Sequence, residues 1–543
     1  MRKRINNSLI LAGLALCCIF NYSCDDFLDK NPDNRADLDS PDNIAALLGS
    51  AYPDYSSVWF TEVMSDNVTD VGPNTAYANA TTRQAYYWER ITNENQDTPD
   101  GYWFSCYRAI AHANQALQSI KELEKNGYYK KSETDPVKGE ALLCRAYAHF
   151  MLVNLFAEHF DPATAETASG IAYVTEVETR PFVEYPRLSV EEVYELIAQD
   201  IEEGFPLISD KIYGEATKWH FNRKAAAIFA SRYYLYRGLP GDWDKVIDYT
   251  DIVLENSPKT YLRDWLSSLD NSLVVSAKAY SRSNNQANIL LRDVISSGFR
   301  GWRYRYTMSL ELIRDRVMYG NPHPTTRNIE NRHVFSNSIT GISQEGCFGV
   351  VKYIEEFKRN AINVNYGVPY IMLPLFVAEE ALFNQIEAEI LRDEDYTKEL
   401  ELLNTYYSTR IVDYDPVAHL ITEETVLATY PATNSPFPHV SPHFSMSAKQ
   451  KRFLECVINI RATEFLNEGQ RWFDIKRMHI PVRHEIYGVG SILLEKDDPR
   501  RVIPLPQDVG NAHSVPENII PQDEDMMFFP IDLNKVKQYN IEK

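Results

Sequence analysis

Cysteine is scarce, and its spacing excludes the common cysteine-based sites. The chain has 7 cysteines among 543 residues, and none of them forms a CxxC pair or a zinc-binding pattern. Outside the first two dozen residues only four remain: Cys106, Cys144, Cys347 and Cys456. Cys106 and Cys144 lie in apolar, helix-prone segments, where a free thiol is usually a small core residue. Whether these two cysteines form a disulfide is left undecided, because the bond depends on an oxidising compartment.

Motifs for catalysis and cofactor binding are also missing. The sequence has no Gly-rich phosphate loop, no GxSxG and no HExxH. His439 and His443 share a proline-rich loop, but no carboxylate or cysteine close in sequence completes a metal shell. Asp66, Asn67 and Asp70 have oxygens that suit a structural Ca²⁺, although ordinary loop solvation explains them as well. We therefore predict a protein that is not an enzyme and needs no cofactor.

Positive charge is in the minority. The chain has 55 Lys and Arg against 76 Asp and Glu, a formal net charge of −21. Such a balance repels phosphate backbones and argues against nucleic-acid binding. It argues equally against docking on anionic lipid by charge alone. With 44% hydrophobic and 24% charged residues, the composition is that of a globular protein.

Long apolar runs are absent beyond the N-terminus. Leu9–Phe20 is apolar throughout, but it is too short to span a bilayer. It follows the basic residues 2–4 and precedes Ser23 and Cys24, as in a lipoprotein export signal. We predict that residues 1–23 are removed and that acylation of Cys24 anchors the mature chain, 24–543. Simple cleavage, which would release a soluble periplasmic product, is the alternative.

The body of the chain has helical periodicity. Apolar residues recur every three or four positions from Trp103 to Leu117, and residues 138–156 are apolar nearly all round. Ser189 and Glu192 form a capping box that predicts the start of another helix. Residues 223–254 and, more weakly, 378–407 look like tetratricopeptide units, each a helix, a tight turn and an amphipathic second helix. The predicted fold class is mainly α, a tetratricopeptide-like helix-pair scaffold over about 100–260 and 375–480.

Three loop-rich segments interrupt the scaffold, at about 55–100, 260–370 and 410–447. They hold turn residues, proline and a few short β-prone runs such as Phe348–Tyr353. Long irregular segments inside a compact domain are usually functional. We interpret the three as ligand-binding insertions in one domain.

Two of these insertions are rich in aromatic residues, which offer flat apolar faces for ligand stacking. The candidate ligand-binding residues are Tyr77, Tyr87 and Trp88 in the first insertion, and Trp302, Tyr304, Arg305 and Tyr306 in the second. Core packing is the alternative for any single ring. We expect at least one of Trp88 and Trp302 to line the site.

Four segments carry a resemblance to a known family. Cys24–Pro32 (CDDFLDKNP), Gly139–Phe150 (GEALLCRAYAHF), Arg461–Arg477 (RATEFLNEGQRWFDIKR) and Ile503–Pro506 (IPLP) resemble elements of the SusD/RagB family. The acidic residues after Cys24 also resemble the surface-export tag of Bacteroidetes lipoproteins. The third segment is the most specific of the four, and we call it the signature segment.

The resemblance implies a SusD-like fold and a glycan platform built from aromatic residues in comparable places. It implies a surface-exposed outer-membrane lipoprotein that binds an oligosaccharide and delivers it to a SusC-like TonB-dependent transporter. A RagB-like component of an oligopeptide importer is the alternative, and a surface glycosidase is a weaker one, because no motif indicates two carboxylates across a cleft.

Charges of alternating sign recur in the signature segment. They are Glu464, Glu468, Arg471, Asp474 and Arg477. At helical spacing they predict ion pairs that hold helices together, not an active site. Glu468 and Gly469 further predict a helix end, after which Trp472 and Phe473 enter the core.

Overall fold

The fold was analysed in a computed structural model. It describes residues 38–75, 79–180, 183, 185–265, 273–318, 333–335, 339–359, 365–435, 437–507, 509 and 528–530. The predicted leader, Cys24 and Tyr77 lie outside these residues, as does the side chain of Trp302. Removal of the leader and acylation of Cys24 therefore stay predictions.

Helices dominate the architecture, so the predicted mainly α fold class is confirmed. The long helices are α6 (Pro99–Asn126), α7 (Lys131–Phe156), α8 (Val190–Gly204), α9 (Arg223–Arg237), α10 (Asp242–Leu254), α15 (Ala378–Arg392), α16 (Thr397–Tyr407), α18 (Ala448–Glu464) and α19 (Gln470–Arg477). Neighbours in sequence pack in pairs, and α10 packs against α15, which joins the earlier helices to the later ones. Among the described residues, none of the helices is long and apolar enough to cross a membrane.

Side chains at the predicted positions determine where the helices begin and end. The Ser189 hydroxyl accepts a hydrogen bond from the Glu192 N–H at 3.1 Å, and the Glu192 carboxylate accepts one from the Ser189 N–H at 2.8 Å. This confirms the capping box of α8. Gly127 and Gly238 end α6 and α9 in the left-handed conformation, with φ of 71° and 59°, which glycine adopts without steric cost.

Shorter helices and strands occupy the insertions. The helices are α3 (Pro41–Leu48), α4 (Val58–Val63), α5 (Ala80–Tyr86), α11 (Pro258–Tyr261), α13 (Leu273–Tyr280), α14 (Leu310–Ile313) and α17 (Glu423–Thr429). The strands are β1 (Thr69–Asp70), β2 (Asn288–Ile295), β3 (Tyr306–Thr307), β4 (Ile339–Ile342), β5 (Cys347–Val350), β6 (Glu356–Arg359), β7 (Gly367–Val377), β8 (Val482–Ile486), β9 (Gly490–Leu494) and β10 (Phe528–Pro530). The β-prone run at 348–353 contributes to β5, which ends at Val350.

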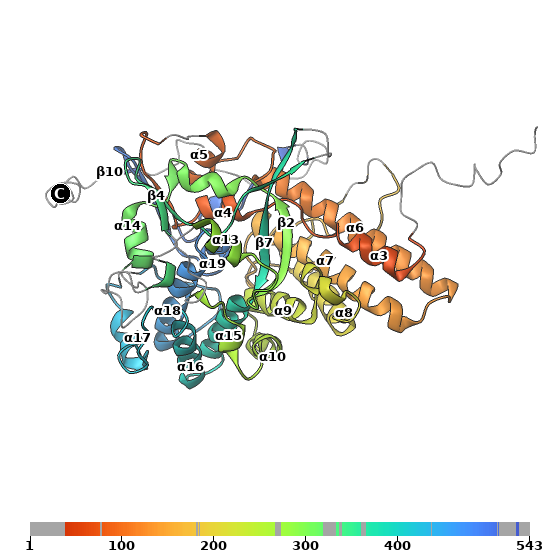
Figure 1. The fold of residues 1–543 in the computed structure, drawn as a ribbon. Helices are drawn as coiled ribbons and strands as arrows, with labels where there is room; N and C mark the ends of the chain where they lie inside the picture. The colour runs from red at the N-terminus through yellow and green to blue at the C-terminus, as the bar shows by residue number, and fades with distance from the viewer. Residues whose placement is uncertain are drawn as a thin grey trace, which may run out of the picture.

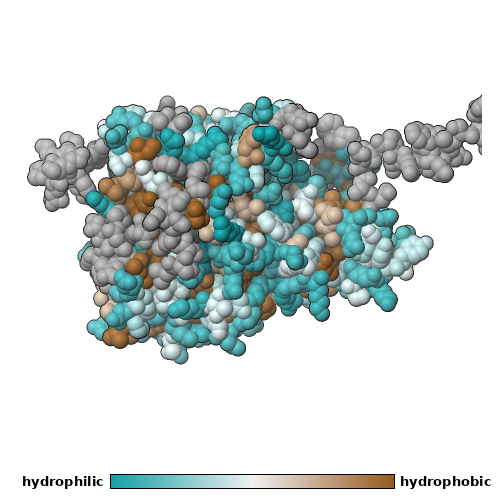
Figure 2. All heavy atoms as spheres, viewed as in Figure 1, coloured by the Kyte–Doolittle hydropathy of each residue, from teal (hydrophilic) through white to brown (hydrophobic). Residues whose placement is uncertain are grey.

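The sheets are small and antiparallel, with strand orders β2-β7-β6, β10-β9-β8, β4-β5 and β1-β3. Strands β2 and β7 run between helices α6–α8 on one side and α15–α18 on the other (Figure 1). Hydrophilic residues cover most of the described surface on this face, and hydrophobic ones form small groups (Figure 2). The strands therefore lie at the junction of the two helical groups.

Tyrosine is a core residue here. Tyr194, Tyr233 and Tyr406 are at most 1% exposed, and their hydroxyls find internal acceptors, such as the Tyr194 carbonyl for Tyr233 at 2.7 Å. Cys106 and Cys144 are buried free thiols. The disulfide left open by the sequence is therefore not formed.

The charges of the signature segment are paired, as predicted, but mostly with distant segments. Glu464 contacts Arg410 at 2.8 Å and Glu468 contacts Lys352 at 2.5 Å. Arg471 contacts Asp66 at 2.7 Å. Only Asp474 and Arg477 pair along one helix, at 2.8 Å. The pairs therefore join α18 and α19 to other parts of the chain.

The predicted helix end at Glu468–Gly469 is wrong. Helix α18 already ends at Glu464, and Gly469 is the residue that precedes α19, with φ of 70°. Trp472 and Phe473 do enter the core, at 0% and 6% exposure. The glycine turns the chain from one helix into the next.

A buried histidine makes stability depend on pH. His149 accepts a hydrogen bond from the Val174 N–H at its Nε2 (3.0 Å), so its Nδ1 carries the proton and donates to the Arg145 carbonyl (2.9 Å). Burial lowers the pKa of His149 to about 3, although the Arg145 carbonyl opposes the shift. Between the unfolded pKa of about 6.5 and that value, the unfolded chain binds the proton and the folded chain does not.

This contribution to stability is complete above pH 6.5 and is lost as the pH falls towards 3. Between pH 6.5 and 4.5 the titration of His149 should lower the free energy of unfolding of the wild type by about 2.7 kcal/mol, at about 1.36 kcal/mol per pH unit. We expect His149→Gln to lack this part of the pH dependence. Urea unfolding of both proteins at the two pH values measures it. An unchanged pH dependence in the variant would show that His149 does not titrate in this way.

Candidate ligand-binding site

The two predicted aromatic segments meet in space. Strand β1 pairs with β3, with Asp70 opposite Tyr306. The Tyr86 and Tyr306 rings stack with centroids 4.6 Å apart, and Tyr87 lies at the edge of Tyr306 at 6.3 Å. The structure thus brings together Tyr87, Arg305 and Tyr306 from insertions about 220 residues apart in the chain.

Guanidinium groups flank these rings. Arg305 binds both carboxylate oxygens of Asp70, at 2.6 and 2.7 Å. Arg83 binds both oxygens of Glu89, at 2.8 and 2.6 Å, and lies 5.6 Å from the centre of the Tyr87 ring. The bond to Asp70 raises the pKa of Arg305 further, so this guanidinium stays charged. We call these four residues, Arg83, Tyr87, Arg305 and Tyr306, the tyrosine–arginine cluster.

The cluster has an exposed rim and a buried floor. The Arg83 side chain is 47% exposed and that of Arg305 is 26% exposed, and Tyr87 is half-buried. Tyr306 is 3% exposed and rests on Tyr86, which is fully buried. Tyr87 and the two guanidiniums can therefore contact a ligand, while Tyr306 and Tyr86 hold them in place.

Trp88 is not part of the exposed rim. Its side chain is 2% exposed, its Nε1 donates to the Met64 carbonyl at 2.9 Å, and its ring stacks on His484 with centroids 4.3 Å apart. The expectation that Trp88 offers a ring face to a ligand is therefore wrong. The backbone at Trp88 has φ of 54°. This turn after α5 accompanies the inward position of the Trp88 side chain.

Tyr304 lies on a different neighbour. Its half-buried ring meets the edge of Trp59 at 5.9 Å. The Trp59 ring covers Gly301, where an added Cβ would be 1.8 Å from the ring. The structure brings Tyr304 against Trp59, and it leaves the roles of Tyr77 and the Trp302 side chain as predictions.

Arg83 in the cluster, and Asp70 and Tyr487 beside it, were not among the residues predicted to bind an oligosaccharide. Arg83 stands four residues before Tyr87, a spacing that places both on one helix face, so the sequence held a usable signal. Tyr487 is 56% exposed, and its backbone N–H donates to Asp70 at 3.2 Å. Its position depends on the hairpin of β8 and β9, for which no local signal exists.

The possible Ca²⁺ ligands have other partners. Asp66 contacts Arg471 at 2.7 Å and Arg316 at 3.2 Å, and Asp70 contacts Arg305. Within the residues that the structure describes, no group of three or more His, Cys, Asp or Glu side chains is arranged to hold a metal. His439 does have a nearby carboxylate, contrary to the sequence reasoning, because Glu455 of α18 lies 2.9 Å from its Nδ1.

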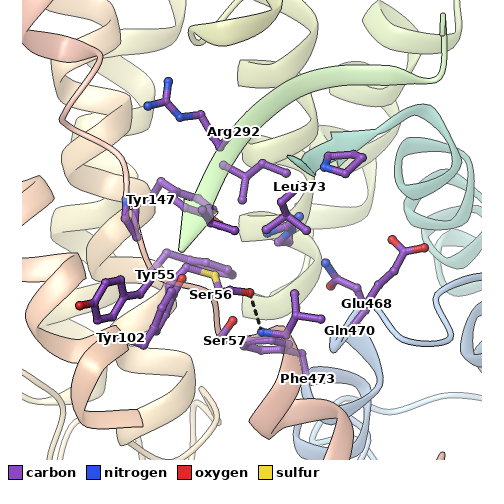
Figure 3. A pocket seen from close by; sticks show the side chains of 18 of the residues that line it. Tyr55, Ser56, Ser57, Tyr102, Tyr147, Arg292, Leu373, Glu468, Gln470 and Phe473 are labelled. Carbon is purple, nitrogen blue, oxygen red and sulfur yellow. Dashed lines mark hydrogen bonds between the residues drawn. The ribbon is translucent and has the colours of Figure 1, made fainter. Parts of the chain in front are cut away.

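A narrow cavity lies between the helices and the sheet (Figure 3). It offers about 50 Å³ of open space, and its lining includes Tyr55, Ser56, Tyr102, Tyr147, Arg292 and Glu468. Figure 3 shows Arg292 at one end, with its guanidinium directed away from the other labelled residues. Glu468 is bound to Lys352, so it is engaged in an ion pair and not available as a free acid or base.

This arrangement, helix pairs with rings and charges on their insertions, is that of a helical-repeat scaffold. A family profile described as "Starch-binding associating with outer membrane" matches residues 26–235. Over these residues the chain is similar to the SusD-like family that the profile represents. No curated protein matches the sequence.

Solved structures share the fold. A SusD superfamily protein from Bacteroides thetaiotaomicron aligns with a TM-score of 0.62 at 16% identity, covering 89% of this chain and 100% of its own. A SusD-like carbohydrate binding protein from Bacteroides vulgatus aligns at 0.61 and 16% identity, covering 88% and 97%. A SusD superfamily protein from Bacteroides fragilis aligns at 0.58 and 16% identity, covering 88% and 98%. At this identity the alignments establish the fold alone.

Proposed function

We propose that this protein is a non-enzymatic surface lipoprotein, anchored through Cys24, that binds an oligosaccharide. It delivers the ligand to a SusC-like TonB-dependent transporter in the outer membrane. The observation that carries the proposal is the meeting of Arg83 and Tyr87, at the end of α5, with Arg305 and Tyr306, at the start of β3. The family's description as starch-binding and associated with the outer membrane supports it.

The chemistry of the cluster suits a sugar. The apolar C–H face of a sugar ring stacks on a tyrosine ring, while its hydroxyls accept hydrogen bonds from guanidinium groups. Because Asp70 and Glu89 already hold both guanidiniums in place, little conformational entropy is lost on binding. The cluster is therefore preorganised for a ligand with alternating apolar and hydroxyl faces.

Loss of the Tyr87 ring is expected to weaken oligosaccharide binding about tenfold or more, equivalent to about 1.4 kcal/mol. A screen of the purified protein against polysaccharides and peptides identifies the ligand, and titration calorimetry compares Tyr87→Ala with the wild type. Tyr128→Ala is the control, because Tyr128 is 84% exposed at the turn between α6 and α7, and it should bind normally.

The same screen tests the alternatives. Unchanged affinity in Tyr87→Ala would remove the cluster as the site. Binding of peptides and not glycans would favour the oligopeptide importer. Turnover of a bound substrate would show that the protein is an enzyme.

A further inference from the structure

A second, wider hollow opens near the cavity of Figure 3. It offers about 630 Å³ of open space and is lined by residues 49, 50 and 52–54, Arg108 and His112 of α6, residues 292–295 of β2, and residues of β6 and β7. Pro53, Arg292 and Val294 line both the cavity and this hollow. Its volume lies within the usual range for ligand sites, so it can take a few units of an oligomer. We call it the basic groove.

The groove has an excess of positive charge, whereas the whole chain is acidic. The groove is lined by four cationic side chains and two carboxylates, whereas the chain has a net charge of −21. The charged residues are Arg108, Arg292, Lys358, Arg359, Asp54 and Asp293. A local excess of positive charge in such an acidic protein attracts anions selectively to this place.

The two carboxylates are already neutralised. Asp54 pairs with Arg108 at 2.6 Å, and Asp293 lies 3.7 Å from Lys358. The groove lining therefore holds two more cations, Arg292 and Arg359, than carboxylates. Lys358 is 67% exposed, and Arg359 follows it on the exposed strand β6, so both can turn towards a ligand.

Arg292 is held at the junction of the groove and the cavity. Its guanidinium donates to the backbone carbonyls of Trp219 and Gly49, at 2.7 and 2.5 Å, and lies 4.3 Å from the Tyr52 ring. Since these acceptors are neutral, its charge is not cancelled by a direct contact with them. His112 adds a buried Nδ1 that has no hydrogen-bond partner within the described part of the chain.

We infer that the basic groove binds the anionic groups of an acidic oligosaccharide, with uronate carboxylates facing Arg292, Lys358 and Arg359. This inference rests on the proposed function and narrows its ligand class. Carboxylates form strong, charge-assisted hydrogen bonds with guanidinium and ammonium groups. The half-buried rings of Tyr55 and Tyr370 beside the groove supply apolar faces for sugar rings.

The test uses uronic-acid oligomers and their carboxyl-reduced, neutral counterparts as probes of the purified protein. We expect the acidic oligomers to bind, to bind more weakly at 0.5 M salt, and to lose about tenfold in affinity in Lys358→Gln/Arg359→Gln. Lys121→Gln/Lys125→Gln is the matched control. It removes the same charge from exposed positions of α6 outside the groove and should leave affinity unchanged.

The other outcomes distinguish a failure of the basic groove as an anion site from a failure of the proposed function. Equal binding of acidic and reduced oligomers, or equal losses in the two double variants, would overturn the groove as an anion site. Binding of neutral glycans alone, lost in Tyr87→Ala, would overturn the groove and support the proposed function. Binding of acidic peptides and of no glycan would overturn both.

Discussion

Gly469→Ala is expected to lower the free energy of unfolding by about 3–5 kcal/mol, combining backbone strain and overpacking. Gly469 has φ of 70°, which L-residues adopt only at a cost. An added Cβ would lie 2.4 Å from the Thr61 hydroxyl oxygen and 2.8 Å from the Cα and the carbonyl oxygen of Val58. Since Val58 meets it with backbone atoms, no side-chain rotation can relieve the overlap, and α4 and α19 must separate.

Separation would also break a buried carboxylate contact. The Gly469 and Asn467 N–H groups donate to Glu62 at 3.0 and 2.9 Å. Burial raises the pKa of Glu62 to about 7, while these N–H donors oppose the shift. Removing these two donors would leave the buried carboxyl with the Asn67 amide, at 3.0 Å, as a remaining donor, and such a loss is costly for a buried group.

Gly127→Ala is the control for backbone strain. Gly127 has φ of 71°, nearly the same as Gly469, but no atom lies within 4 Å of its added Cβ. It should lose only about 1–2 kcal/mol, the cost of the left-handed conformation. Urea unfolding of both variants measures the difference, and equal losses would show that contact with α4 contributes nothing.

The helical scaffold was predictable because its signals are local. Periodicity over a dozen residues and the Ser189–Glu192 box lie within single segments. The helix-pair unit predicted over 223–254 is observed as the pair α9 and α10. Each of these patterns reports on a face or an end of one helix, independent of the rest of the chain.

The tyrosine–arginine cluster was predictable only in part, because it depends on contacts between distant segments. Composition located the two aromatic insertions, but the pairing of Asp70 with Tyr306 covers two residues of each strand, too few for a periodic signal. Tyr87 and Trp88 are adjacent and similar in character. The backbone turn after α5 puts one at the surface and the other against His484, and nothing local distinguishes them.

The signature segment shows the same limit for electrostatics. Helical spacing correctly indicated paired charges, yet local pairing applies only to Asp474 and Arg477. Arg410, Lys352 and Asp66 come from segments 50 to 400 residues away in sequence. The sequence shows that a charged residue needs a counter-charge if it is buried. The fold decides which residue supplies that counter-charge.

Arg410→Met is expected to lower the free energy of unfolding by about 3–5 kcal/mol at neutral pH. The Arg410 side chain is fully buried and binds Glu464 through Nε and Nη2 at 2.8 and 3.0 Å, and Glu379 through Nη2 at 2.9 Å. Its Nη1 donates to the Arg263 carbonyl at 3.0 Å. Methionine fills much of the volume but removes the cation that both buried carboxylates bind.

The control for Arg410→Met is Lys398→Met. It breaks the exposed pair between Lys398 and Glu401, 3.1 Å apart with side chains 44% and 65% exposed. An exposed pair of this kind contributes less than about 1 kcal/mol. Similar losses in the two variants would show that burial adds nothing to the Arg410 pairs.

The pH dependence of the loss separates charge from packing. Burial alone would raise the pKa of Glu464, but Arg410 lowers it to about 2, so the pair's contribution is complete above the unfolded pKa of about 4.3 and is lost as the pH falls towards 2. Without Arg410, burial raises the pKa of Glu464, and a carboxyl that takes up a proton no longer has the penalty of a buried charge. Urea unfolding should therefore give a smaller difference between variant and wild type at pH 5 than at pH 8. A cavity or packing defect would give the same difference at both pH values, because no proton is involved.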